Sequence, residues 1–330
     1  MQPCQPDSRS FFDKLQSAEG LDLRDKRGKR HPLAVVLVGV TLALLSNRDG
    51  CLSSIQRHLA NHYESLVLVL GVAKERPVSR PQLPRILDRV SVSVFDNLIF
   101  SHFGVQLNEK ERKWLAIDGK EMRGSIALGE KRGEVVVQAV THERGRTVAQ
   151  TYYHGQKESE VPTVRKLLEN TYLAGEKISL DALHCKPKTL EIITQAKGKY
   201  LVGLKENQKE LLKQVVKTSA NQAILWKAIK NKKEHGRIER RSYEFYDILE
   251  MAKDERWKNS QIRTGIKVTR QREEVKKGKK SLETSYYLSN EVGKYEEIRQ
   301  AIEGHWQVEM NNHLRDVTLK EDAMRSKKRT

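Results

Sequence analysis

The order of strand-like and helical segments after residue 113 is the feature that most limits the fold of this chain. Five segments rich in β-branched and aromatic residues predict strands, at 113–118, 134–142, 147–154, 177–183 and 199–205. A short ERGR turn separates the second from the third, which predicts a hairpin. Segments with helical spacing of apolar side chains separate the later strands and follow the last one. The predicted order is β-β-β-α-β-α-β-α, with the last two strands parallel to the first.

This order matches the ribonuclease H-like fold, an α/β (α+β) architecture with a mixed five-stranded sheet and helices on both faces. In that topology the first and fourth strands are neighbours at the centre of the sheet. Asp118 is predicted at the end of the first strand and Asp181 at the end of the fourth. Two acids at the same end of adjacent strands can share a metal ion. An Asp-Gly turn is the purely structural alternative for Asp118.

A third acid is expected from a helix near the C-terminus. Residues 226–290 turn basic and strand-like, which predicts a β-rich insertion followed by that helix. Four apolar side chains form one stripe on the helix: Tyr295, Ile298, Ile302 and Trp306. Glu309 continues this face, and an acid on a buried stripe is costly unless a cation meets it. A metal held by the two aspartates would do so.

Two aspartates and one glutamate suit a magnesium site, because Mg²⁺ prefers oxygen ligands and keeps several waters. Two such ions about 4 Å apart stabilise the attacking and leaving oxygens of an in-line phosphoryl displacement. Asp118, Asp181 and Glu309 are therefore the candidate catalytic residues and metal ligands. Mg²⁺ is the expected cofactor, with Mn²⁺ as its substitute.

The charge of the chain indicates a nucleic acid partner. Lys and Arg number 61 against 43 Asp and Glu, which gives a formal net charge of +18. The surplus is spread along the sequence, so a disordered basic arm does not explain it, and nucleic acid is favoured over a membrane. Three cysteines without a Cys-x-x-Cys pair suit the reducing cytoplasm, where we expect the protein to associate with the nucleoid.

Residues 1–108 predict a separate helical domain, suited to DNA binding. Its most apolar run, Pro32–Ser46, is about five residues short of a membrane span, so a buried helix is favoured. A catalytic domain is expected at 109–225 and 291–330, with the basic insertion 226–290 between its two parts.

Five motifs, taken together, carry a resemblance to a known family. They are IDGKEMRGS, LDALHCK, YLVGLKENQKEL, GRIERR and GHWQVEMNNHLRDVTLKED. The chain resembles insertion-sequence transposases of the H-repeat-associated branch of the DDE superfamily, and the resemblance covers nearly its whole length. The N-terminal residues are similar to the helical DDE-transposase-associated domain. Any one motif is a weak signal, whereas five in the right order are specific.

The resemblance implies that Asp118, Asp181 and Glu309 hold the metal. Ten further residues are candidates for DNA contact: Lys120, Arg123, Lys205, Asn207, Gln208, Arg237, Arg240, His305, Trp306 and Arg315. Turn and helix-start chemistry is an equal interpretation of the Lys-x-Asn-Gln motif, and a solvated face is the commoner role for any single arginine, including Arg241. Trp306 could stack on an unpaired base, although a core tryptophan is the more common finding on a helix.

The resemblance implies a DNA transposase that cuts strands at the ends of its element and joins the freed 3′ ends to target DNA, as a homodimer on terminal inverted repeats. Glu303 and Met310 depart from the residues common in the family, and relatives usually continue past 326–330 with another apolar helix. A metal-dependent nuclease of the same fold and an inactive DNA-binding relic are the alternative functions.

Overall fold

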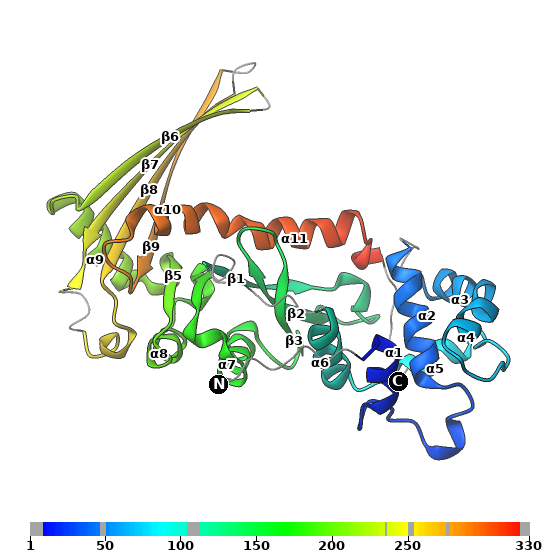
Figure 1. Ribbon diagram of the computed structural model, residues 1–330. Helices are drawn as coiled ribbons and strands as arrows, with labels where there is room; N and C mark the ends of the chain where they lie inside the picture. Colours follow the sequence, from blue (N-terminus) through cyan, green and yellow to red (C-terminus); the bar gives the residue numbers. More distant parts are fainter. Residues whose placement is uncertain are drawn as a thin grey trace. The chain divides into compact units, whose positions relative to one another are not determined.

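A computed structural model describes residues 9–46, 51–103, 113–234, 236–249, 254–274 and 278–323 (Figure 1). The chain forms two compact units. The first contains residues Met1–Gln106, Met122–Gly133 and His313–Thr330, and the second contains residues Leu107–Glu121 and Glu134–Asn312. The C-terminal residues 326–330 lie outside the described residues.

The first unit contains a helical core, as the sequence predicts. Its helices are α1 (Phe11–Ser17), α2 (Leu33–Leu45), α3 (Leu52–Asn61), α4 (Tyr63–Val69), α5 (Gln82–Leu87) and α6 (Val92–Phe103). Ser10 begins α1 with a capping box, in which its hydroxyl accepts from the N–H of Asp13 at 3.1 Å. The apolar run becomes α2, which packs against α1, α3 and α4. No helix among the described residues has the length and apolar character needed to cross a membrane.

The second unit is built on one mixed sheet. Its first five strands are β1 (Leu115–Glu121), β2 (Glu134–Thr141), β3 (Thr147–His154), β4 (Lys177–Leu180) and β5 (Lys199–Leu204). β1 pairs with β2 antiparallel and with β4 parallel, and β4 pairs with β5 parallel. The fold class predicted from the sequence is confirmed, with β1 and β4 as neighbours.

The strands of the insertion extend this same sheet. They are β6 (Trp226–Glu234), β7 (Arg237–Asp247), β8 (Thr264–Glu274) and β9 (Lys279–Ser289). β9 pairs with β5, so the described residues form a nine-stranded sheet in the order β3-β2-β1-β4-β5-β9-β8-β7-β6. Figure 1 shows β6 to β9 as a long twisted ribbon that reaches away from the central strands. The central five strands are as predicted, and the insertion is a continuation of them.

Helices cover both faces of the central strands. They are α7 (Glu160–Asn170), α8 (Pro187–Gln195) and α9 (Lys209–Asn221) on one face, and α10 (Tyr295–Gly304) and α11 (Trp306–Val317) on the other. Successive side chains of β1 alternate between these faces. Leu115 and Ile117 pack in the cluster with α7 and α8, whereas Ala116 packs against Val308 of α11.

Candidate active site

Asp118 and Asp181 lie side by side because of the register between β1 and β4. Ile117 pairs with Leu180 in the last step of this parallel ladder, so the next residue of each segment is an aspartate. β4 ends there, whereas β1 continues along β2 beyond this point. Asp118 is therefore inside a strand rather than at its end, and Gly119 is a strand residue. An Asp-Gly turn does not explain these two residues.

Strand alternation directs the acids to the face covered by α10 and α11. On β4, Lys177 forms an ion pair with Glu297 of α10, and the hydroxyl of Ser179 bonds with His305. Asp181 continues this series two residues later. The segment of α10 and His305 therefore contacts the polar side chains of β4 on the same face as the two aspartates.

Helix α11 brings two polar side chains to Asp118. Val308 is fully buried and packs against Ala116, two residues before Asp118 on the same face of β1. The Asn312 side-chain amide donates a hydrogen bond to Asp118 Oδ2 at 3.2 Å. Glu309 follows Val308 directly, and its negative charge acts on Asp118.

The prediction that Trp306 lies in the core is wrong, because its side chain is 61% exposed. The buried line of this helical segment passes through Ile298, Ala301 and Val308, with His305 between the last two. These positions are three or four residues apart, as one helical face requires. Trp306 follows His305 by one residue and therefore points away from that face.

The Asp118 carboxyl group has a pKa raised to about 7. Burial is the largest cause, and the negative charges of Glu160, Asp181 and Glu309 raise it further. Partial desolvation also raises the pKa of Glu309, although this residue is exposed rather than on the buried stripe that the sequence predicts. The three predicted acids, together with Glu160, thus contribute to one region of concentrated negative charge.

Asn207 and Gln208 hold the loop that follows Asp181. The amide of Asn207 donates to the backbone oxygen of Ala182 at 2.6 Å, and the amide of Gln208 donates to that of Cys185 at 2.8 Å. Both amides are thus engaged within the protein. This favours the turn-and-helix-start interpretation of the motif over a DNA contact for these two residues.

A buried hydrogen-bonded chain joins α10 and α11 to the sheet beneath the acids. Ser179 Oγ lies 2.7 Å from His142 Nε2 and 2.8 Å from His305 Nδ1. Burial lowers the pKa of His142 to about 3 and that of His305 to about 4, so both rings are neutral at pH 7. Gly304 allows this approach, because a side chain there would overlap the ring of His142. The chain fixes the start of α11 and with it Glu309, one helical turn further on.

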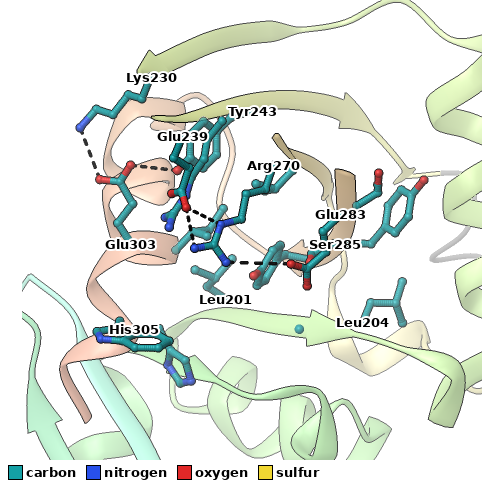
Figure 2. Close-up of a pocket in the computed structure, with 18 of the residues that line it drawn as sticks. Leu201, Leu204, Lys230, Glu239, Tyr243, Arg270, Glu283, Ser285, Glu303 and His305 are labelled. Atoms are coloured by element: carbon teal, nitrogen blue, oxygen red, sulfur yellow. Dashed lines mark hydrogen bonds and ion pairs between the residues drawn. The ribbon is translucent and has the colours of Figure 1, made fainter. Parts of the chain in front are cut away.

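A cleft of about 1560 Å³ opens beside Glu309. It is lined by residues of β5, of the insertion strands and of α10 and α11. Cations on its wall pair with acids: Arg270 bonds with Glu239 at 2.6 Å, and Lys230 lies 3.3 Å from Glu303 (Figure 2). Glu303, which departs from the family pattern, therefore takes part in this polar wall.

The ten residues predicted to contact DNA occupy different environments. In the second unit, Lys205, Arg237 and Trp306 are exposed and line the cleft. Arg240 is also exposed, but alternation along β7 turns it to the opposite face. Lys120 is buried, since β1 continues past Asp118. In the first unit, Arg123 is exposed, and Arg315 pairs with Glu321 at 2.7 Å.

The sequence pattern does not predict Glu160 or His184 as site residues. Glu160 is the first residue of α7, where an acid normally complements the helix dipole, so the pattern offers no reason to assign it to the site. His184 follows Asp181 by three residues in the LDALHCK motif. His184 Nε2 lies 2.9 Å from Glu160 Oε1 and 4.0 Å from Asp181 Oδ1.

The donor chemistry of this site fits a hard divalent cation. Aspartate and glutamate oxygens are the ligands that Mg²⁺ prefers, and a cation would relieve the mutual repulsion around Asp118. In the part of the chain that the structure describes, no three His, Cys, Asp or Glu side chains are already grouped to hold a metal ion. The fit rests on the ligand type and the concentrated charge.

Fold and site together define a ribonuclease H-like protein with two adjacent aspartates and a glutamate on a following helix. The model of a family described as "Transposase DDE domain" matches residues 109–330. The chain belongs to this family of DDE transposases, which confirms the resemblance predicted from its motifs.

Individual relatives agree with this assignment. Over 252 residues the chain is 28% identical to YncI of Escherichia coli O157:H7. This match covers 71% of the chain and 63% of YncI. Over 313 residues the chain is 24% identical to YhhI of Escherichia coli strain K12. This match covers 91% of the chain and 81% of YhhI. Both are named as putative transposases, and YhhI as H repeat-associated.

Proposed function

We propose that the protein is a DNA transposase that cuts strands at the ends of its element and joins the freed 3′ ends to target DNA. The observation that carries this proposal is that the register between β1 and β4 brings Asp118 and Asp181 together in a chain of the DDE transposase family. Assembly as a homodimer on paired terminal repeats is part of the proposal.

Asp118, Asp181 and Glu309 would hold Mg²⁺, or Mn²⁺ in its place. When bound, two such ions supply charge stabilisation for the attacking and leaving oxygens of phosphoryl transfer. The contribution of the chain itself is positioning: strand register aligns the aspartates, and the bond between Ser179 and His305 anchors the helix of Glu309. Near neutral pH the cation must also displace a proton from Asp118, whose pKa is raised to about 7.

DNA would lie along the cleft beside Glu309. Lys205 and Arg237 are exposed there and suit contacts with phosphates, and Trp306 offers a surface for base stacking. The cations that pair with Glu239 and Glu303 contribute less, because neighbouring acids already offset their charge.

DNA affinity should fall steeply with salt, because each neutralised phosphate contributes about −0.9 to the slope of log affinity against log salt concentration. Fluorescence anisotropy with a labelled duplex measures this slope. Lys205→Gln should make the slope shallower by about 1. Lys166→Gln is the matched control, since Lys166 is exposed on α7 over the opposite face. Salt-independent binding would remove DNA phosphates as the partner.

The test of the proposed function is incubation of the full chain with a duplex that carries the DNA flanking its gene, a second target duplex and Mg²⁺. We expect cuts at one position near each end and products in which the new 3′ ends are joined to the target. Cutting without joining would support the metal-dependent nuclease instead. Binding without cutting, in Mg²⁺ and in Mn²⁺, would support the inactive relic.

A further inference from the structure

The carboxylate of Glu160 is fixed beside Asp118 by a buried histidine. The His184 side chain is 1% exposed, that of Glu160 is 17% exposed, and Nε2 of the histidine lies 2.9 Å from Oε1 of the acid. In the described part of the chain, Nδ1 of His184 is buried without a hydrogen-bond partner. A proton on Nε2, donated to Glu160, is thus the tautomer that satisfies the contact.

Gly119 makes room for this carboxylate. A Cβ atom on Gly119 would lie 2.5 Å from Glu160 Oε2, closer than real Cβ contacts come. Because side chains alternate along β1, Gly119 faces α7 while Asp118 faces α11. The missing side chain therefore opens a path by which Glu160 reaches the aspartates from the face opposite Glu309. The glycine of this Asp-Gly pair therefore leaves space for Glu160 within β1, and it does not form a turn.

A carboxylate held in this place is unfavourable without a cation. Its Oε2 lies against Gly119, the residue that directly follows Asp118 on β1. Its partner in the structure is an imidazole that also approaches Asp181 to 4.0 Å. Like charges packed this closely are retained where a metal ion offsets them.

We propose that Glu160 is a fourth acid of the metal site and that His184 is the positioning residue that holds it. The inference rests on the proposed function, because it places Glu160 in the same metal site. It adds a carboxylate on α7 to those of Asp118 on β1, Asp181 directly after β4 and Glu309 on α11. The cation would then be approached by oxygen donors from both faces of the sheet.

The test is a calorimetric titration of the full-length, DNA-free protein with Mn²⁺, which measures binding without relying on activity. Glu160→Gln should weaken Mn²⁺ binding about tenfold or more, the scale on which supporting groups of metal sites act. Glu169→Gln, an exposed acid in the last turn of the same helix, is the matched control and should bind as the wild type does. Circular dichroism and thermal unfolding show that each variant is folded.

Variants of His184 test the positioning role in the same titration. His184→Ala should also weaken Mn²⁺ binding, and His184→Gln should recover part of the loss because its amide can still donate to Glu160. Equal Mn²⁺ affinity of the wild type and a folded Glu160→Gln variant would overturn the inference and leave the transposase proposal standing. Mn²⁺ binding that depends on Glu160 in a protein that never cuts DNA would support the inference and defeat the proposed activity. A wild type that binds no Mn²⁺ would overturn the inference directly.

Discussion

Asp181→Asn is expected to lower the rate of strand cleavage by about 100-fold or more while DNA affinity stays nearly unchanged. Even outer partners of a metal site cost about 10–100-fold when they are lost, and Asp181 is proposed as a direct ligand. The loop should survive, because Asp181 Oδ1 accepts the N–H of Leu183 at 2.9 Å and an asparagine oxygen can do the same. Gel-shift and cleavage assays on one end-containing duplex measure both properties.

Asp247→Asn is a closely matched control for this change. Asp247 is exposed at the end of β7, and its Oδ1 accepts the N–H of Leu249 at 2.9 Å, the same local contact that Asp181 makes. This variant should cut DNA at the wild-type rate. Cleavage by Asp181→Asn at the wild-type rate would reduce Asp181 to a loop-capping residue and contradict the active-site assignment.

Asp118→Asn should stabilise the metal-free protein at alkaline pH by up to about 4 kcal/mol, the equivalent of raising a carboxyl pKa from 3.8 to about 7. Above pH 7 the folded wild type carries an ionised, half-buried carboxylate close to other acids. Asparagine removes that charge and can still accept the hydrogen bond from Asn312.

The sign of the pH dependence follows from the raised pKa. Between pH 3.8 and about 7 the folded state holds the proton more tightly than the unfolded state, so the cost of ionised Asp118 disappears as the pH falls. The advantage of the variant should therefore be complete above pH 7 and shrink by about 1.4 kcal/mol per pH unit toward pH 4. Urea unfolding in EDTA measures it, with Asp247→Asn as the control. An equal difference at every pH would show that Asp118 bears no such charge.

Local patterns predict the central strands and the adjacency of the two aspartates. Segments between Trp114 and Lys205 define the strands, and their order matches the ribonuclease H-like topology, in which β4 lies beside β1. The union of β9 with β5 is not predictable in this way, because that pairing joins residues far apart in the chain and no local pattern encodes it.

Errors at the site have equally specific causes. The predicted apolar stripe, which begins at Tyr295, assigns Trp306 to the buried face of the helix. The buried face passes through Ala301 and Val308 instead, and it leaves Trp306 exposed. Lys120 is predicted to contact DNA, but β1 continues past Asp118 and the alternation of side chains along the strand buries Lys120. Glu160 is missed because a helix-start acid signals only a favourable dipole contact, and its proximity to Asp118 arises from tertiary packing.

Anomalous diffraction from crystals of the full chain grown with Mn²⁺ tests the central claim most directly. The claim is that Asp118, Asp181 and Glu309 form one divalent metal site. We expect anomalous density in contact with all three carboxylates, and its loss in crystals of Asp181→Asn. Mn²⁺ bound elsewhere on the protein, in crystals of a preparation that cuts DNA in Mn²⁺, would contradict the account.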